Sequence, residues 1–115
     1  MTLPATVTTR SCADEISLEI SVPAALDAFA GHFPGHPVLP GVYQIDWAMQ
    51  FAALHFGIEQ TVASDFQVKF RQVIRPQASL ALHLRIDAAR RSLAFEYRLG
   101  REVASAGKIR LESRP

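Results

Sequence analysis

The chain has 115 residues, of which 49% are hydrophobic and 20% are charged, and its formal net charge is +1. The length suits one domain covering residues 1–115, and the composition excludes a disordered chain and a disulfide scaffold. The single cysteine, Cys12, excludes an intramolecular disulfide and a cysteine-based metal site, and we expect it to pack as a small filler. The sequence shows neither a leader pattern nor a membrane-spanning stretch, so we expect a cytoplasmic protein.

The first predicted strand covers residues 15–22, whose sequence EISLEISV alternates polar and apolar side chains. A period of two residues places one side of a strand in the core and the other in water. Residues 23–29, which begin with Pro23, are compatible with a single helical turn. Residues 42–56 form the long helical candidate, which is apolar on nearly every side. A helix of this kind must be buried on several sides.

Three later segments, residues 65–71, 80–86 and 93–99, show the same two-residue alternation. In the first of them, we expect Phe66 and Phe70 to lie on the core side. The connections that follow the second and third of them, residues 87–90 and 100–101, are short, which favours antiparallel hairpins. Together the segments predict a meander with one face in the core and one face in water.

A weaker strand candidate covers residues 102–111, with Val103, Ile109 and Leu111 facing inward and Gly107 marking a bulge or a close approach. The whole pattern predicts an α+β fold in which a strongly curved antiparallel sheet wraps around one central helix. A chain this short leaves part of so apolar a helix uncovered. We therefore expect a second copy of the chain to close that surface.

The basic residues are unevenly placed along the chain: Arg10 alone precedes Phe66, and the other eleven Lys and Arg lie at or beyond Lys69. This asymmetry predicts a basic region on one part of the surface. Such a region suits an acidic protein partner or nucleic acid, but the sequence contains no nucleic-acid-binding motif and no basic stripe interleaved with aromatic residues. Basic side chains that solvate the outer face of a sheet explain the asymmetry equally well.

The stretch GHFPGHPVLPGVYQIDWAMQ, residues 31–50, begins with a stiff loop. Pro34, Pro37 and Pro40 fix their own φ angles and favour extended backbone at the residues before them, so the loop loses little freedom on folding. Gly41 ends the loop directly before the helix, where backbone N–H groups lack partners within the helix. A carbonyl oxygen that gains negative charge would be well placed at these groups.

Asp46 is the only charged residue of the predicted helix, and it shares a face with Val42, Ile45 and Met49. We expect it to be substantially buried, and a buried carboxylate without a counter-charge tends to keep its proton. Gln50, one turn further on, is placed to hydrogen-bond to it. A protonated acid in an apolar pocket is a good proton donor at neutral pH.

The sequence contains four histidines, and the simplest interpretation of His55 and His83 is structural, at a helix end and on the wet face of a strand. His32 and His36 differ because the stiff loop that carries them leads straight to the helix start and Asp46. A metal site at these two residues is not favoured, since a His-x3-His spacing in a Pro/Gly loop lacks the helical geometry that brings two rings together.

The residues HFPGHPVLPGVYQIDWAMQ resemble the signature of the 3-hydroxyacyl-acyl carrier protein dehydratases of bacterial fatty acid synthesis, which share the hotdog fold. The match combines His-Phe-Pro-Gly, Pro-x-x-Pro-Gly, an acid fourteen residues after the first His, and Ala-Met-x-Gln. The letters KFR at residues 69–71 resemble another recurrent segment of the family. Within the family, QIDWAMQ is most similar to small dehydratases of aryl-polyene and related polyketide-like pathways.

The resemblance implies that His32 is the catalytic base and Asp46 the catalytic acid, in a dimer whose active sites each take one of the two residues from each protomer. The family's backbone roles carry over to Gly41, whose N–H polarises the thioester carbonyl, and to Val38, whose C=O orients the His ring. Gln50 completes the expected substrate site. Some family members carry Glu at the acid position, and Asp resembles the branch that also isomerises the product double bond.

The implied reaction is the dehydration of a (3R)-3-hydroxyacyl thioester, carried on the phosphopantetheine arm of an acyl carrier protein, to a trans-2-enoyl thioester. The reaction requires no metal and no redox cofactor. Carrier proteins are acidic, so we expect Lys69, Arg71 and Arg75 to contact the carrier.

Two alternative functions stay open. One is a hotdog thioesterase that uses an acid on the central helix to activate water. The other is a non-catalytic subunit that binds the carrier or completes a heterodimer with a related hotdog subunit.

Overall fold

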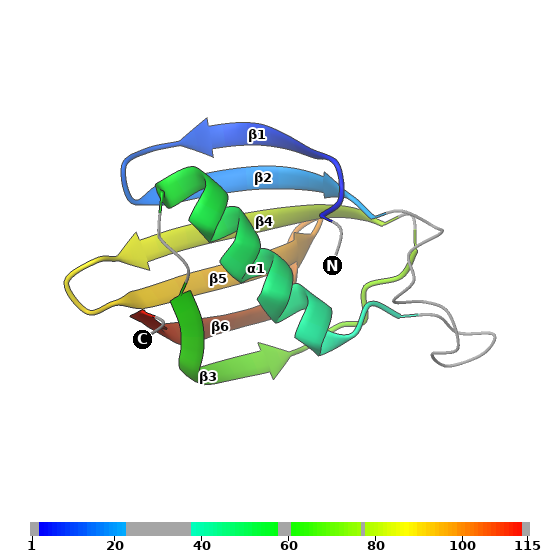
Figure 1. The fold of residues 1–115 in the computed structure, drawn as a ribbon. Helices are drawn as coiled ribbons and strands as arrows, with labels where there is room; N and C mark the ends of the chain where they lie inside the picture. Colours follow the sequence, from blue (N-terminus) through cyan, green and yellow to red (C-terminus); the bar gives the residue numbers. More distant parts are fainter. Residues whose placement is uncertain (1–2, 23–37, 58–60, 77, 114–115) are drawn as a thin grey trace.

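The computed structural model describes residues 3–22, 38–57, 61–76 and 78–113. These residues form a six-stranded sheet, in which every neighbouring pair of strands is antiparallel. One long helix lies diagonally across the sheet, which curves around it (Figure 1). The predicted α+β architecture is therefore confirmed. Residues 23–29, which the sequence makes compatible with a helical turn, lie outside the described part of the chain.

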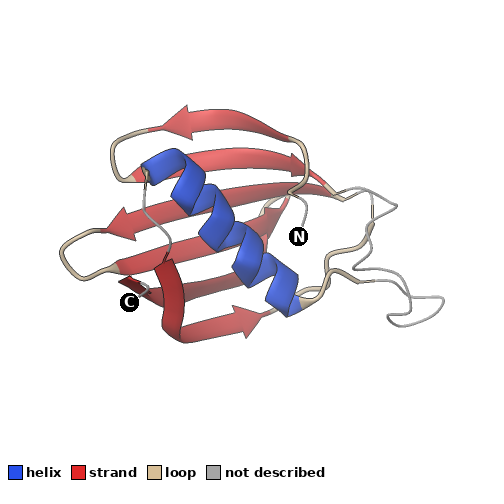
Figure 2. Cartoon of the chain, viewed as in Figure 1, coloured by secondary structure: helices blue, strands red, loops and turns tan. Residues whose placement is uncertain are grey.

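The elements follow one another in a simple order: β1 (Thr6–Ser11), β2 (Glu15–Ser21), α1 (Gly41–Phe56), β3 (Thr61–Phe70), β4 (Ser79–Asp87), β5 (Ser92–Leu99) and β6 (Glu102–Ser113). In the sheet the order is β1-β2-β4-β5-β6-β3. The strands β4, β5 and β6 form a meander (Figure 2). The sequence pattern places residues 65–71 in the meander as well, but β3 pairs with β6 and lies at one edge of the sheet, with β1 at the other. Within the described ranges, no helix has both the length and the apolarity needed to cross a lipid bilayer.

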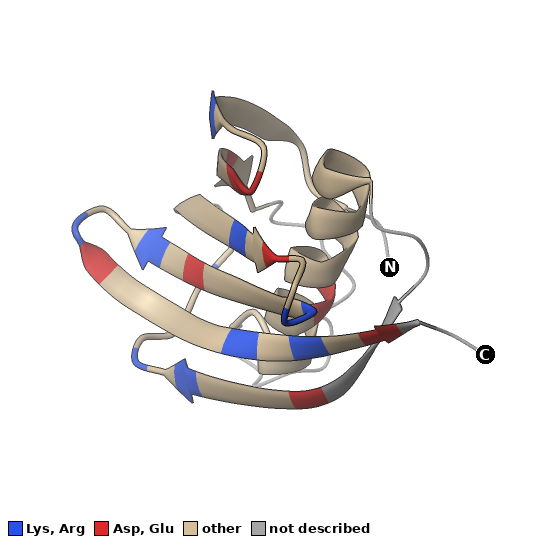
Figure 3. Ribbon diagram, turned by 90° about the vertical axis from the view of Figure 1, so that its left-hand side faces the viewer, with Lys and Arg blue, Asp and Glu red and all other residues tan. Residues whose placement is uncertain are grey.

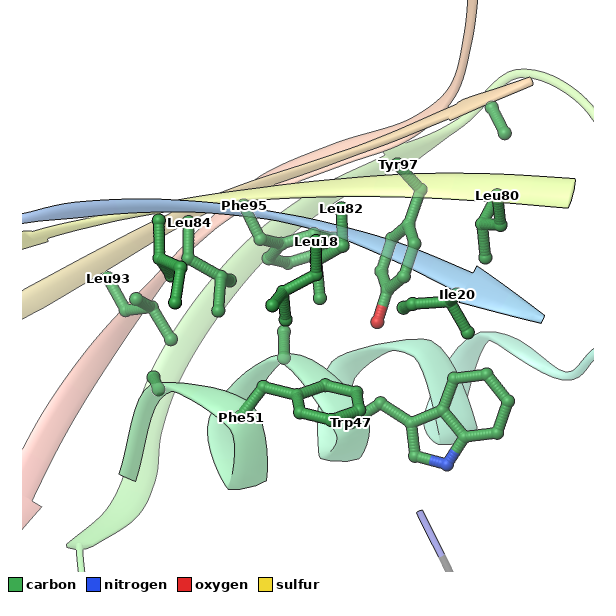
Figure 4. Close-up of a cluster of buried hydrophobic side chains, with 14 of the residues drawn as sticks. Leu18, Ile20, Trp47, Phe51, Leu80, Leu82, Leu84, Leu93, Phe95 and Tyr97 are labelled. Carbon is green, nitrogen blue, oxygen red and sulfur yellow. The ribbon is translucent and has the colours of Figure 1, made fainter. Parts of the chain in front are cut away.

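The core fills the space between α1 and the strands that it crosses (Figure 4). The helix contributes Trp47, Ala48, Phe51 and Ala52, all of which are buried. The labelled core side chains of the sheet are Leu18, Ile20, Leu80, Leu82, Leu84, Leu93, Phe95 and Tyr97. Complete burial of one such aliphatic or aromatic side chain contributes about 1.5–3 kcal/mol. Together these contacts fix the helix, and with it any group that the helix carries, against a rigid sheet.

The edge strand β1 is not predicted by the alternation pattern. Its sequence, TVTTRS, has no apolar alternation, and most of its side chains are exposed. Main-chain pairing with β2 holds it in the sheet, with a register shift between Thr8 and Arg10. Cys12 directly follows β1 and is exposed, so the expectation that it packs as a filler is wrong.

One predicted inward residue of β6, Val103, faces outward. A register shift in the pairing of β5 with β6 places Val103 opposite Arg98 and Ser105 opposite Tyr97. The extra residue, Ala104, is buried. Because directly paired residues of antiparallel strands share a face, Val103 lies with the exposed Arg98 on the outer side of the sheet. The other two predicted inward residues of this strand are buried, as expected.

Gly107 allows two backbones to approach closely. It pairs in regular register with Val68 of β3 and Phe95 of β5, so the register shows no bulge at this position. A Cβ on Gly107 would lie 2.5 Å from the backbone oxygen of Gln67. The predicted close approach is therefore confirmed, and any side chain at this position would force β3 and β6 apart.

The edge strand β3 has an apolar side that α1 does not cover. Phe66 and Phe70 pair with Ile109 and Ser105, two buried residues, so they lie on the helix-facing side as predicted. Their exposed fractions are nevertheless 53% and 52%. The expectation that they are buried is wrong for a single chain, because α1 packs against β4 and β5 and leaves this edge of the sheet open.

Candidate functional site

The backbone just before α1 is held by a hydrogen bond to the loop that follows β3. The N–H of Leu39 donates to the carbonyl oxygen of Ile74 at 2.7 Å. The described residues contain no cis peptide bond, and in a trans peptide the C=O and N–H groups point in opposite directions. The carbonyl of Val38 belongs to the same peptide as the N–H of Leu39. It therefore points away from Ile74.

The amide of Gly41 points out of the N-terminal end of α1. Pro40, the N-cap residue, has an extended backbone, and its carbonyl accepts hydrogen bonds from the N–H groups of Tyr43 at 3.1 Å and Gln44 at 3.3 Å. The N–H of Gly41 is the other end of that peptide, so it points away from the helix. The first turn has no acidic residue, and no described side chain caps it. The positive end of the helix dipole is therefore not neutralised by these residues.

The ring of Phe70 lies directly against Gly41. A Cβ built on Gly41 would be 2.5 Å from Cζ of Phe70. The φ angle of Gly41 is not positive, so backbone conformation does not demand glycine, and a Cβ at this position would displace the half-exposed Phe70 ring. The half-exposed ring of an edge strand thus lines the approach to the Gly41 amide.

Asp46 lies one turn into α1, on the flank of the helix. It is half-buried, together with Ile45 and Met49 on the same flank, and Val42 is exposed. The expectation of substantial burial is therefore not met within one chain, because the stripe that packs on the sheet runs along a neighbouring face. The predicted hydrogen bond is confirmed: Nε2 of Gln50 donates to Oδ2 of Asp46. This bond fixes the carboxyl group on the open flank.

Tyr97 lies beneath this part of the helix, and sequence reasoning assigns it no role beyond facing the core. Its hydroxyl points toward the helix (Figure 4). It donates to the backbone carbonyl of Gln44 at 2.6 Å. Burial raises the pKa of Tyr97 well above its ordinary value, and the negative charge of Asp46 raises it further. The phenol therefore stays protonated and acts as a donor. A lone Tyr among the inward Leu and Phe residues of β5 was the available sequence signal, because a buried phenol needs a partner.

We expect the free energy of unfolding of Tyr97→Phe to fall less than that of the wild type as the pH becomes alkaline. A raised folded-state pKa means that the unfolded state loses its proton first. The stability contributed by the neutral phenol is thus complete below about pH 10 and is lost as pH rises toward the folded-state pKa. At neutral pH, removing the bond to the Gln44 carbonyl should cost about 0.5–1.5 kcal/mol. Denaturant unfolding at about pH 8 and about pH 11 measures both effects.

The matched control is Tyr43→Phe, which removes a phenol at a half-buried site on α1. If the stability of Tyr97→Phe depended on pH as strongly as that of the wild type, the expectation would be wrong.

The predicted carrier contacts are exposed residues on β3 or just after it. Lys69 is an exposed residue of β3 that alternates with the helix-facing Phe70, so it lies on the outer side of the sheet. Arg71 and Arg75 are exposed in the chain that follows. Figure 3 shows basic and acidic residues interspersed over the strands, and Arg98 and Glu96 form an ion pair at 2.6 Å. The outer face is thus mixed in charge, not uniformly basic.

Four of the predicted site residues lie along one described stretch. Val38 precedes α1, and Gly41, Asp46 and Gln50 lie within its first three turns. His32, the predicted base, lies outside the described residues, as does the neighbouring loop to residue 37. Within the described ranges, no three His, Cys, Asp or Glu side chains are grouped so that they could hold a metal ion. The described part of the site therefore offers a backbone amide and a carboxyl group.

The sequence matches the model of the family described as ApeI-like, ApeI dehydratase, over residues 8–108. It is similar to the 3-hydroxyacyl-acyl-carrier-protein dehydratase FabZ of Rickettsia massiliae (strain Mtu5), with 29% identity over 94 residues. The FabZ of Lactobacillus helveticus (strain DPC 4571) is 36% identical over 69 residues. These alignments cover 75% and 54% of this chain. They cover 63% and 47% of the relatives, so the chain spans less than two thirds of their length.

Solved structures agree on the fold. A chain of the dehydratase heterocomplex ApeI:P from Xenorhabdus doucetiae superposes with a TM-score of 0.88 and 33% identity, covering 97% of this chain and 100% of that one. An uncharacterized protein from Erwinia carotovora subsp. atroseptica gives a TM-score of 0.80 with 33% identity, over 96% and 97% of the two chains. Thioesterase superfamily member 2 from Mus musculus, at 0.69 and 9% identity over 90% and 78%, shares the fold alone. The predicted hotdog fold is confirmed.

Proposed function

We propose, from the premise that this chain belongs to the ApeI-like dehydratase family, that it removes water from (3R)-3-hydroxyacyl thioesters carried by an acyl carrier protein. The product is the trans-2-enoyl thioester, for fatty acid or aryl-polyene and related polyketide-like synthesis in the cytoplasm. One observation carries the proposal. The outward N–H of Gly41 and the half-buried carboxyl group of Asp46 lie in the N-terminal half of one helix, where Gln50 holds the carboxyl group.

The proposed chemistry breaks one C–H bond and one C–O bond. His32 takes the proton from C2, and the N–H of Gly41 stabilises the negative charge that develops on the thioester oxygen. Asp46, in its protonated form, donates to the C3 hydroxyl, which leaves as water as the C2–C3 double bond forms. The carbonyl of Val38 orients the ring of the base, and Gln50 holds the acid. Each proton transfer is worth about 10² to 10⁴ in rate, and one oxyanion donor is worth about 3 kcal/mol.

We further propose that the active site is completed by a second hotdog subunit. Among the described strands, β3 pairs with β6 alone, and it carries the half-exposed Phe66 and Phe70. Natural proteins usually cover such an edge. A second copy placed there also covers the open flank of α1, so that Asp46 meets His32 of the other protomer. Because the structure from Xenorhabdus doucetiae is a heterocomplex, a related subunit is the alternative occupant.

The substrate arrives on an acidic carrier protein through its phosphopantetheine arm, and the enzyme uses no other cofactor. Lys69, Arg71 and Arg75 are exposed cations on or just after β3. They flank the strand whose Phe70 lines the approach to Gly41. This position, on the rim of the proposed subunit contact, suits long-range attraction of an acidic partner.

Mass spectrometry of carrier-bound 3-hydroxyacyl chains tests the proposal directly. Incubation with the purified chain is expected to remove one water from the acyl group, with the carrier thioester intact. Release of free carrier thiol would instead identify a thioesterase. Carrier chains that stay unchanged with the chain alone, and lose water only after a related subunit is added, would identify a non-catalytic or heteromeric role. A series of acyl chain lengths in the same experiment defines the preferred substrate.

A further inference from the structure

Gln44 is a buried polar residue on the core side of α1, where its exposed fraction is 3%. Its Oε1 accepts a hydrogen bond from Oγ of Ser105 at 2.6 Å, and its Nε2 donates to the carbonyl of Leu39 at 3.1 Å. Its backbone carbonyl accepts the bond from Tyr97. We call Gln44, Leu39, Tyr97 and Ser105 the Gln44 hub. An apolar side chain of equal size would fill this space at a lower desolvation cost, so packing alone does not account for Gln44.

The Gln44 side chain holds the peptide that joins Leu39 to Pro40. Backbone hydrogen bonds hold the peptides on either side of it. The carbonyl of Leu39 is fixed by Gln44, and the N–H of Leu39 is fixed by Ile74. Pro40 has no N–H, so the Leu39 carbonyl is the only group through which this peptide can be held. The next peptide ends in the N–H of Gly41. Three successive peptide planes are thus held by inward hydrogen bonds, and only the bond to the middle one comes from a side chain.

We propose that Gln44 is a positioning residue that sets the direction of the Gly41 N–H and the Val38 carbonyl. This inference rests on the proposed function, in which those two backbone groups serve the reaction. Gln44 touches neither substrate nor reacting atoms. It ties the segment 38–41 to the core side of α1 through its bond to the Leu39 carbonyl. A site built on rigid elements holds its groups more accurately than a free loop does.

The consequence for catalysis is a specific pattern in the kinetics. The bond from the Gly41 amide to the substrate oxygen strengthens as negative charge develops, so it acts mainly in the transition state. A displacement of about 1 Å costs about 100-fold in rate. Loss of the bond from Gln44 to Leu39 should therefore lower kcat and leave KM nearly unchanged. A residue that only stabilised the fold would instead lower the melting temperature, with kcat preserved in the folded fraction.

Two variants separate these roles. Gln44→Met keeps the volume and removes both side-chain bonds, whereas Ser105→Ala removes one bond of the same hub and keeps the bond to Leu39. Gln44→Met is expected to lower kcat by about 10- to 100-fold, with KM within about twofold, and Ser105→Ala is expected to keep kcat. If Gln44→Met does not fold, the double variant Gln44→Met with Ser105→Ala replaces it, because it also removes the hydroxyl that Met leaves without a partner and still lacks the donor to the Leu39 carbonyl. Equal kcat losses in the Gln44 and Ser105 variants, or a Gln44 variant with normal kcat, would overturn the inference.

A second measurement does not depend on dehydratase activity. In amide NMR spectra, the Gly41 resonance of the Gln44 variant is expected to shift and broaden, while that of Ser105→Ala stays sharp. An unchanged Gly41 signal in the Gln44 variant overturns the positioning role even if the enzyme is a dehydratase. A wild-type protein without dehydratase activity but with the expected NMR change would refute the proposed function and leave the role of Gln44 in holding segment 38–41 in place.

Discussion

Asp46→Asn is expected to lower kcat for dehydration by about 10²- to 10⁴-fold, the range typical of a lost general acid. An amide cannot supply the proton that the C3 hydroxyl needs to leave as water. The shape of the side chain is kept, and its oxygen can still accept the hydrogen bond from Gln50. Because Asp46 is half-buried on the flank of α1, the melting temperature should change little. Steady-state assays with a carrier-bound 3-hydroxyacyl chain, together with thermal unfolding, measure both quantities.

Two variants control this experiment. Asp46→Glu keeps a transferable proton on a longer side chain, so part of the activity should remain. Asp65→Asn makes the same change of charge at an exposed position of β3, where it should leave kcat unchanged. An Asp46→Asn variant with more than half of the wild-type kcat would remove this carboxyl group from the mechanism. A loss of equal size in Asp65→Asn would show that net charge, and not proton donation, sets the rate.

The central fold was predictable because its signals are local. Alternation in residues 15–22 and 80–86 identifies β2 and β4, and the apolar run of residues 42–56 agrees with α1 to within one residue. The exceptions depend on contacts between distant segments. A period of two residues cannot reveal the register shift that turns Val103 outward. Nor does it reveal β1, whose stability comes from pairing with β2 and not from burial of its own side chains.

Whether a side chain is covered was harder to predict than the face of the strand or helix on which it lies. The pattern places Phe66 and Phe70 on the correct side of β3, but only the position of α1 decides whether anything covers them. The same reasoning applies to Asp46, whose helical face is evident from spacing while its half-open environment is not. In the sequence, Gln44 is one of a few polar residues in an apolar helix, and no pattern distinguishes it from the others. One of its hydrogen-bond partners, Ser105, lies 61 residues further along the chain.

Mixing two inactive variants, His32→Ala and Asp46→Asn, is expected to restore activity. If each active site takes its base from one protomer and its acid from the other, a mixed dimer contains one site with both groups and one site with neither. Random exchange makes half of the dimers mixed, so about one quarter of all sites should regain function. The open flank of Asp46 and the uncovered Phe66 and Phe70 of β3 motivate this expectation, because both point to a missing second subunit.

The design of the mixture makes the result decisive. The control mixes a chain that carries both substitutions with the Asp46→Asn chain. No dimer in this mixture has an intact acid, so it should stay inactive. Phe66→Asp places a charge on the apolar side of β3, where it should oppose dimer formation and prevent recovery when introduced into both partners. Native mass spectrometry reports whether subunits exchange. Subunits that exchange fully without any recovery of activity would show that base and acid belong to the same protomer. In that case, each site of a mixed dimer has either His32 or Asp46, but never both.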